Sequence, residues 1–249
     1  MFSGKRRKTE TADTSAIVVA AGNASRMGGL DKQFLCIGGI PVLIRSLQKF
    51  EACPSVCEVV VVTKEESIPL LHQLTVEYQL QKIRTIVTGG KTRQQSVEKG
   101  LREISAQSRL VAIHDGARPF VRPEDIEACI ALARETGAAT LGVPVKDTIK
   151  QIDGNGKIIA TPDRQSLYLT QTPQVFFAAD YKKAMEKALA LAQDFTDDCQ
   201  LLENLGIPVR MVKGSYSNIK ITTPEDLAIA AGLLSCQSGW EEGVESCFE

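Results

Sequence analysis

Residues 17–34 of the chain read IVVAAGNASRMGGLDKQF, an apolar run followed at once by a loop of small and basic residues. The run Ile17–Ala21 has no polar side chain, which is typical of a strand buried on both faces of a parallel sheet. In such sheets, ligands bind beyond the carboxyl ends of the strands. The loop that begins near Gly22 is therefore the first place to expect chemistry.

The same alternation of apolar run and amphipathic segment repeats along the chain. The predicted strands are Ile17–Ala21, Val59–Thr63, Ile83–Val87, Leu110–His114, Ala139–Val143 and Val209–Val212. The predicted helices are Val42–Phe50, Glu66–Gln79, Thr92–Glu103, Glu124–Thr136 and Ala179–Ala192. This order predicts an α/β fold, a doubly wound and mostly parallel sheet with helices on both faces.

One stretch interrupts the alternation. Two β-prone runs, Val145–Ile152 and Lys157–Thr161, flank the turn Asp153–Gly156, which predicts a β-hairpin. A two-stranded ribbon is marginally stable in water by itself. Because little neighbouring sequence can cover this arm (about residues 145–161), we expect it to pack on a second copy of the chain.

Composition excludes several classes of protein. The 249 residues include 29 Lys and Arg against 30 Asp and Glu, a net charge of -1, so the chain lacks the basic surface that nucleic acids need. No apolar run approaches the ~18 residues of a membrane span. The basic N-terminus has no apolar segment after it, which argues against a secretory signal. We therefore expect a cytoplasmic protein with neither nucleic acid nor membrane as a partner.

The two ends differ from the body in charge. Residues 1–15 carry four basic and two acidic side chains, whereas residues 235–249 carry four glutamates. Neither end has hydrophobic periodicity. The sequence thus predicts a disordered basic tail (1–15), one catalytic domain (16–234) and an acidic C-terminal tail (235–249).

Cysteine and histidine usage argues against a metal centre of the zinc type. The seven cysteines are scattered without a C-x-x-C pair, and the only histidines are His72 and His114. Free thiols in a reducing compartment are the simpler interpretation. Catalysis must then rely on Lys, Arg, Asp and backbone amides.

The loop after the first predicted strand has the features of a phosphate cradle. Ala20, Ala21 and Gly22 let backbone amides approach phosphate oxygens, while Arg26 and Lys32 can neutralise the charge of a reacting phosphate. The loop matches neither the glycine fingerprint of dinucleotide-binding folds nor a P-loop. A hydride-transfer enzyme is therefore disfavoured, and a solvated Gly-rich turn is the alternative.

Two other segments have both a structural and a functional interpretation. After the third predicted strand, Gly89 and Gly90 precede a helix, where backbone groups and Ser96 can contact a nucleobase or simply form a turn. The segment Phe195–Asp198 either caps a helix or presents polar groups to a substrate.

A carboxylate follows the fourth predicted strand. Asp115 suits a Mg²⁺ ligand, and Arg118 suits an anion contact beside it. We expect His114 in the core, because neighbouring residues of a strand point to opposite faces. Lys220 lies on a predicted short strand before a helix that begins at Pro224, as either an exposed residue or an inward cation.

Three motifs together resemble one family. AAGNASRMGGLDKQFL (20–35), HDGARPFV (114–121) and NIKITTPEDL (218–227) are similar to the 2-C-methyl-D-erythritol 4-phosphate cytidylyltransferases of the non-mevalonate isoprenoid pathway. The resemblance implies the nucleotidyltransferase version of the doubly wound fold, a homodimer joined by the arm, and Mg²⁺ or another divalent cation. It also implies transfer of the cytidylyl group of CTP to 2-C-methyl-D-erythritol 4-phosphate, which yields 4-diphosphocytidyl-2-C-methyl-D-erythritol and pyrophosphate.

The resemblance also implies roles for individual residues. It makes Arg26 and Lys32 the transition-state cations and places Asp115, as metal ligand, with Arg118 at the sugar phosphate. The residues implied at CTP are Ala20, Ala21, Gly22, Gly89, Gly90, Ser96 and Ala117. The residues implied at the acceptor substrate are Asp115, Arg118, Thr196 and Lys220, with Arg164 and Thr172 reaching into the partner's site. The chain departs from the family pattern at Ala24, Asp31 and Lys91, where Gly, Pro and an acidic residue are usual.

Two alternatives stay open. The same loops would serve a ribitol 5-phosphate cytidylyltransferase with a different sugar pocket. A non-catalytic nucleotide-binding module is the second alternative, and the joint presence of Arg26, Lys32 and Asp115 argues against it.

Overall fold

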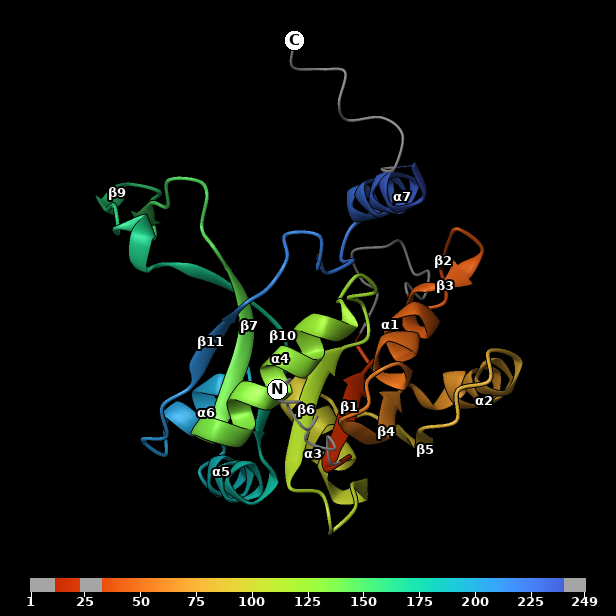
Figure 1. The fold of residues 1–249 in the computed structure, drawn as a ribbon. Helices are drawn as coiled ribbons and strands as arrows, with labels where there is room; N and C mark the ends of the chain where they lie inside the picture. Colours follow the sequence, from red (N-terminus) through yellow and green to blue (C-terminus); the bar gives the residue numbers. More distant parts are fainter. Residues whose placement is uncertain (1–11, 23–32, 240–249) are drawn as a thin grey trace, which may run out of the picture.

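A mostly parallel sheet forms the centre of the computed structural model, which describes residues 12–22 and 33–239. The strand order is β11-β7-β10-β6-β1-β4-β5 (Figure 1). The strands are β1 (Thr14–Val19), β4 (Val56–Thr63), β5 (Ile83–Thr88), β6 (Leu110–Asp115), β7 (Ala138–Pro144), β10 (Tyr168–Phe177) and β11 (Arg210–Lys213). Only β10 runs antiparallel to its neighbours in this sheet, β6 and β7. The predicted α/β fold class is confirmed.

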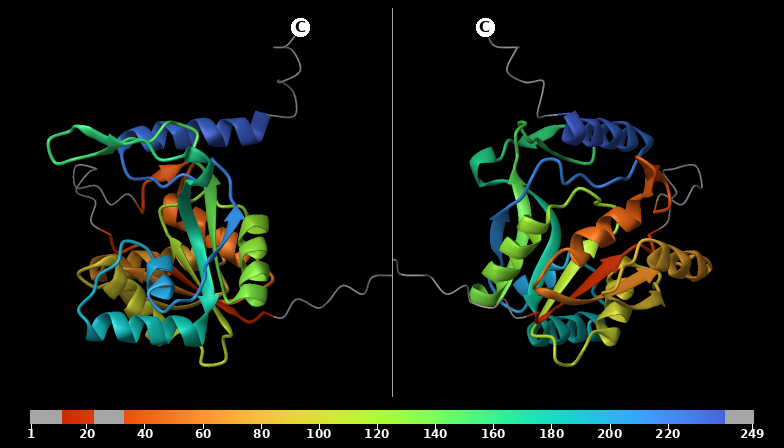
Figure 2. Two further views of the ribbon diagram at one scale, coloured as in Figure 1. Left: turned by 90° about the vertical axis from the view of Figure 1, so that its left-hand side faces the viewer. Right: turned by 45° about the vertical axis from the view of Figure 1, so that its right-hand side comes forward.

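Helices cover both faces of the sheet, which makes three layers (Figure 2). Apolar residues of α1 (Val42–Glu51), α2 (Ile68–Glu77) and α4 (Pro123–Thr136) pack on one face. Those of α3 (Arg93–Glu103), α5 (Ala178–Ala190) and α6 (Cys199–Glu203) pack on the other. The last helix, α7 (Pro224–Gly239), packs against the small hairpin of β2 (Cys36–Ile37) and β3 (Ile40–Pro41).

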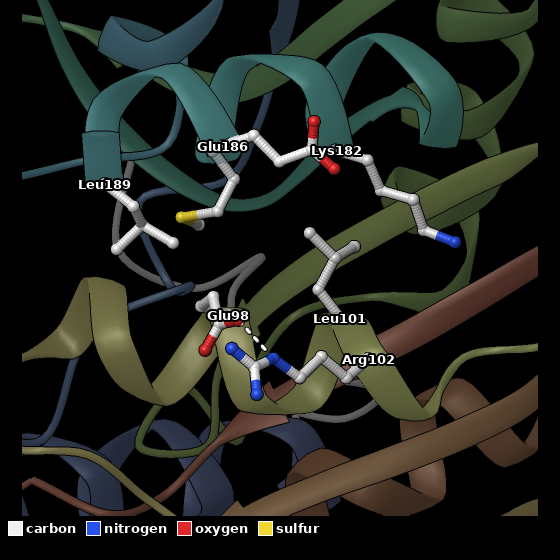
Figure 3. Close-up of a pocket in the computed structure, with 7 residues that line it drawn as sticks. Glu98, Leu101, Arg102, Lys182, Glu186 and Leu189 are labelled. Carbon is white, nitrogen blue, oxygen red and sulfur yellow. Dashed lines mark hydrogen bonds and ion pairs between the residues drawn. The ribbon is translucent and has the colours of Figure 1, made fainter. Parts of the chain in front are cut away.

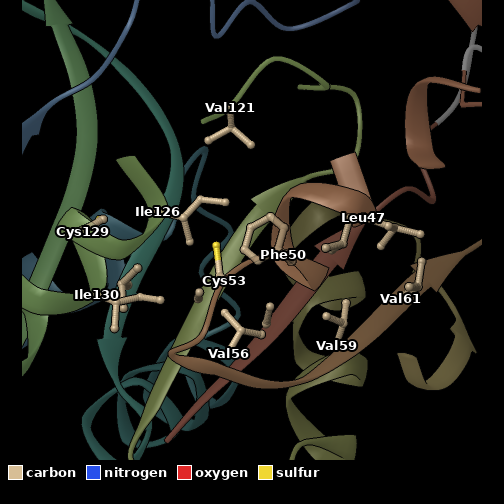
Figure 4. Packing of buried hydrophobic residues seen from close by; sticks show 14 of the residues in the cluster. Leu47, Phe50, Cys53, Val56, Val59, Val61, Val121, Ile126, Cys129 and Ile130 are labelled. Atoms are coloured by element: carbon tan, nitrogen blue, oxygen red, sulfur yellow. The ribbon is translucent and has the colours of Figure 1, made fainter. Parts of the chain in front are cut away.

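Each central strand contains an apolar run because both of its faces are buried. In β1, Ala16 and Val18 belong to the core under α1 and α4, whereas Ile17 belongs to the core under α3 and α5. Figure 4 shows the first of these cores, where Phe50 of α1 faces Ile126 of α4. Burying a side chain of this size stabilises the fold by roughly 1.5–3 kcal/mol.

The predicted arm is a hairpin of β8 (Gln151–Ile152) and β9 (Ile158–Ala160), with shorter strands than expected. The Asp153 carboxylate accepts hydrogen bonds from the backbone N–H groups of Asn155 and Lys157, which closes the turn. The arm and α7 both extend from the same end of the molecule (Figures 1 and 2). In the described part of the chain, no helix has the length and apolar character needed to cross a membrane.

The structure corrects several sequence-based expectations. The antiparallel strand β10 was not predicted, and α6 was expected only as one of two alternatives, the helix cap at Phe195–Asp198. The short strand expected around Lys220 is wrong, because residues 218–222 form no strand and the Ile221 N–H bonds only to the Ala117 carbonyl. Strand β1 begins at Thr14 and α7 continues to Gly239, so both elements extend past the expected domain bounds of 16 and 234.

Candidate active site

The sheet order places a crevice at the carboxyl ends of β1 and β6. After β1, the next strands of this sheet, β4 and β5, lie on one side of it, whereas the following strand, β6, lies on its other side. Ligands of doubly wound sheets bind where the order of the strands reverses in this way. The last residues of the two strands, Val19 and Asp115, are direct neighbours in the register. A cavity of about 330 Å³ opens here. Its wall consists of Val19, Ala21, Gly22, Gln33, Gly90, Lys91, Thr92, Arg93, Ser96, Asp115, Ala117 and Lys220.

One wall of this cavity is the turn between β5 and α3. The Thr92 side chain caps α3 by accepting the Gln95 N–H. The Ser96 hydroxyl accepts the Gly90 N–H at 3.0 Å and donates to the Thr92 carbonyl at 2.9 Å, which holds the turn against the helix. A Cβ atom on Gly89 would collide with Ala21, so only glycine lets this turn approach the end of β1.

A second, smaller cavity of about 160 Å³ adjoins the first. Its wall consists of Arg93, Asp115, Arg118, Thr170, Gln171, Thr172, Gln174, Thr196, Asp197 and Lys220. Arg93, Asp115 and Lys220 line both cavities. These three side chains therefore mark a junction between two neighbouring binding volumes.

The junction is a cluster of charges around one carboxylate. Asp115 Oδ2 lies 2.9 Å from Lys220 Nζ and 3.6 Å from Arg118 Nε, and Asp115 Oδ1 lies 3.3 Å from Arg93 Nε. Burial alone would raise the pKa of Asp115, but the three cations hold that pKa well below its usual range. Asp115 is thus ionised at neutral pH, with three cations around its carboxylate.

A series of buried hydrogen bonds supports this junction from the protein interior. The Asp115 N–H donates to the Thr172 hydroxyl at 3.1 Å, and that hydroxyl lies 3.0 Å from His114 Nδ1. His114 Nε2 lies 3.3 Å from the Arg118 carbonyl. These partners fit a neutral imidazole that donates from Nε2 and accepts at Nδ1. The Thr172 hydroxyl hydrogen then points to His114 and away from the cavity.

Another cavity, of about 440 Å³, lies between α3 and α5 (Figure 3). The side chains of Leu101 and Leu189 face each other across it, and Glu98 pairs with Arg102 at its rim. It is larger than the crevice, but it lies between these two helices and not at the carboxyl edge of the sheet. None of the predicted site residues lines it.

Comparison with known proteins agrees with this geometry. A sequence model of the family described as 2-C-methyl-D-erythritol 4-phosphate cytidylyltransferase (IspD) matches residues 14–235. The chain belongs to this cytidylyltransferase family. A relative of the same name from Halalkalibacterium halodurans is 45% identical over 222 residues, covering 89% of this chain and 96% of the relative. One from Desulforamulus reducens is 43% identical over 229 residues, covering 91% and 98%.

Solved structures of the cytidylyltransferase family share the fold. The 4-diphosphocytidyl-2C-methyl-D-erythritol synthase of Anaerococcus prevotii superposes with a TM-score of 0.81 at 35% identity, covering 89% of this chain and 96% of that one. The cytidylyltransferase of Thermus thermophilus gives 0.73 at 33% identity, covering 89% and 98%.

The structure places most of the residues expected at CTP around the larger cavity. Ala21, Gly22, Gly90, Ser96 and Ala117 line it. Two others lie behind the wall, since Ala20 is buried in the core and Gly89 packs on Ala21 and Ser96. The two expected transition-state cations, Arg26 and Lys32, lie outside the described residues.

The residues expected at the acceptor divide into two groups. Asp115, Arg118, Thr172, Thr196 and Lys220 line the smaller cavity. Thr172 lies beside Asp115 of its own chain, because β10 pairs with β6, and the expectation that Thr172 reaches a partner's site stays a prediction. Arg164 lines neither cavity, and its guanidinium donates to the Lys146 carbonyl at 3.0 Å.

Sequence reasoning missed the charged residue Arg93 at the site, and it named the partner of Arg93, Asp198, only as part of the segment Phe195–Asp198. Arg93 Nη1 lies 2.7 Å from Asp198 Oδ2. One signal was present: an arginine in the first turn of a helix opposes the helix dipole, so it needs a carboxylate partner. Nothing in the sequence says that the partner lies on a loop more than a hundred residues later.

Proposed function

We propose that the chain is an enzyme that transfers the cytidylyl group of CTP to 2-C-methyl-D-erythritol 4-phosphate, a step in isoprenoid precursor synthesis. The observation that carries this proposal is the junction of two cavities at Arg93, Asp115 and Lys220, in a chain that belongs to a cytidylyltransferase family. The larger cavity would take CTP, and the smaller one would take the sugar phosphate.

The reaction needs positioning and charge neutralisation more than proton transfer. An oxygen of the acceptor's phosphate attacks the α-phosphorus of CTP in line. The new P–O bond forms as the bond from that phosphorus to the bridging oxygen breaks, and pyrophosphate leaves. Because the attacking phosphate is already ionised at neutral pH, no general base is required. Lys220 and Arg118 would hold the acceptor's phosphate against the α-phosphorus.

Further cations would come from the loop after β1. Arg26 and Lys32 are proposed to stabilise the charge that builds on the α-phosphate and on the leaving pyrophosphate. Backbone groups around Gly22 and Gly90 would contact the nucleotide, since both glycines line the larger cavity. Thr196 would bind the acceptor from the opposite wall of the smaller cavity.

A Mg²⁺ ion, or another divalent cation, would bind at Asp115. In the described chain, no three His, Cys, Asp or Glu side chains gather into a protein-only metal site. One carboxylate that lines both cavities nevertheless fits Mg²⁺, which commonly takes one or two carboxylates and completes its shell with substrate phosphates and water. When bound, the ion would offset the charge of the triphosphate.

The arm would join two chains into a homodimer. Its exposed apolar side chains support this assembly, because an isolated ribbon with such a surface lacks a core of its own. They are Ile149, Ile152, Ile158 and Ile159. Arg164 follows the arm directly and would then reach the partner's acceptor cavity.

We also propose a cytoplasmic location. The six described cysteines are free thiols, which suits a reducing compartment.

The test is pyrophosphate release with CTP, ATP, UTP or GTP, each paired with 2-C-methyl-D-erythritol 4-phosphate or ribitol 5-phosphate. We expect the fastest release with CTP and the methylerythritol phosphate, loss of release with EDTA, and recovery with Mg²⁺. Faster release with ribitol 5-phosphate would assign the alternative enzyme. No release with any pair would leave a nucleotide-binding module without catalysis.

A further inference from the structure

Arg93 occupies a distinctive place in the site, although nothing in the proposed reaction uses it. It begins α3, immediately after the turn that lines the nucleotide cavity, and its side chain is 26% exposed. Its guanidinium spans two carboxylates, with Nε 3.3 Å from Asp115 Oδ1 and Nη1 2.7 Å from Asp198 Oδ2. One side chain thus connects the end of β6 with the segment before α6.

Asp198 is fixed from the protein interior. The buried Tyr181 hydroxyl donates to Asp198 Oδ1 at 2.5 Å, and the Asp198 N–H donates to Gln174 Oε1 at 2.9 Å. The Tyr181 ring is itself stacked on Phe176, with 5.1 Å between the ring centroids. Asp198 is therefore anchored in the core under α5, and its ion pair with Arg93 holds the Arg93 guanidinium in a fixed position.

The first turn of α3 also holds the backbone before Asp198. Gln94 accepts the Phe195 N–H at 3.0 Å and donates to the Gln193 carbonyl at 2.8 Å. The acceptor-lining residue Thr196 follows directly. Bonds from α3 thus set the position of this wall of the smaller cavity relative to the nucleotide-binding turn.

The number of ion-pair partners distinguishes Arg93 from the other two cations at the junction. Lys220 has Asp115 as its ion-pair partner, and Arg118 pairs with the same carboxylate. Arg93 pairs with Asp198 as well, so a second carboxylate holds its guanidinium in place beside Asp115. Burial opposes its charge, yet the fields of Asp198 and Asp115 raise the pKa of Arg93 above its usual value.

We propose that Arg93 is a positioning residue: anchored by Asp198, it fixes the Asp115 carboxylate at the junction and ties the acceptor-binding segment 195–198 to the nucleotide-binding turn. The inference rests on the proposed function. Lysine cannot replace it, since an ammonium group lacks the planar fork that reaches two carboxylates at once.

The test uses three substitutions in the full-length protein. Arg93→Lys keeps the charge but loses the bridge, and Tyr181→Phe removes only the hydroxyl that anchors Asp198. Arg102→Lys, on an exposed side chain of the same helix, is the matched control. For each variant we would measure kcat, the separate KM values for CTP and the sugar phosphate, CTP affinity by calorimetry, and the melting temperature.

We expect Arg93→Lys to lower kcat/KM for the sugar phosphate by about 10²-fold while CTP affinity changes by less than about 3-fold. Tyr181→Phe should change the same parameter in the same direction by about 3–10-fold, and Arg102→Lys should match the wild type. Wild-type kinetics in Arg93→Lys would overturn the inference. An equal loss of CTP affinity and acceptor kcat/KM would also overturn it, because that pattern marks a general structural role. An inactive wild type would instead contradict the proposed function.

Discussion

The buried imidazole of His114 should make the stability of the fold depend on pH. His114 is completely buried, and its ring packs on Phe50 with 5.0 Å between the ring centroids. Burial lowers the pKa of His114 to about 3, with a further contribution from Arg118 against the opposing field of Asp115. The folded protein therefore keeps this side chain neutral at every pH at which it is ordinarily handled.

The sign and size of the effect follow from proton linkage. In the unfolded chain the pKa of a histidine is ~6.5, so between pH 6.5 and 3 the unfolded state binds more protons than the folded state. The stabilisation is complete above pH 6.5 and declines as the pH falls, by at most about 1.4 kcal/mol per pH unit. Between pH 7.5 and 4.5, His114 should lower the free energy of unfolding by about 2–3 kcal/mol.

Urea unfolding of the protein in EDTA, at several pH values from 7.5 to 4.5, measures this effect. We expect the stability difference between the wild type and His114→Gln to shrink by about 2–3 kcal/mol over this range. His72→Gln is the matched control, since His72 is the only other histidine and is exposed on α2. Parallel pH curves for the wild type and His114→Gln would refute the reasoning.

A second measurement does not depend on how well His114→Gln folds. In His72→Gln, the single remaining imidazole NMR signal belongs to His114, and it should not titrate above pH 4.5. A midpoint near pH 6.5 would contradict the buried neutral state.

Three other predictions concern the site and the arm. Gly89→Ala forces a methyl group against Ala21, so CTP affinity measured by calorimetry should fall and the free energy of unfolding should decrease by ~1–3 kcal/mol. An unchanged affinity would mean that the turn has room for the methyl group. Lys220→Met should lower kcat/KM for the sugar phosphate by ~10²–10³, far more than it lowers CTP affinity, and equal losses would remove Lys220 from the acceptor site. Charging the arm with Ile152→Asp and Ile158→Asp should shift the sedimentation coefficient from dimer to monomer, whereas a dimer that persists would place the interface elsewhere.

The sequence predicts those parts of the fold whose residues face a core on both sides. Such strands contain continuous apolar runs, Val59–Val62 in β4 and Leu110–Ile113 in β6, and the structure confirms the predicted strands within a few residues. Strand β10 carries no such signal, because its buried residues include Gln171, Thr172 and Gln174. Hydrogen bonds to residues distant in the sequence allow these polar side chains to be buried. A search for hydrophobic periodicity does not detect such bonds.

The same limit applies to the candidate site. Asp115 and Gly90 were predictable because Asp115 ends β6 and Gly90 lies two residues after β5, and the parallel sheet brings such positions to one edge. Arg93 was not predicted, because its role depends on Asp198, which only the packing of α5 and α6 brings near. A buried ion pair between distant segments leaves no spacing pattern in a sequence.

The direction of β10 explains why the site has two unlike halves. Parallel strands bring loops and helix N-termini to the carboxyl edge of the sheet, and these suit a nucleotide's phosphates. Strand β10 runs the other way, so its first half, with Thr170 and Thr172, lies at the edge where β7 ends and the arm begins. The smaller cavity, which we propose binds the acceptor, therefore takes its polar wall from the strand that carries the chain back from the arm. If two arms pair in a homodimer, the interface is continuous through β10 with the acceptor side of the site, while the nucleotide side rests on β1, β5 and α3.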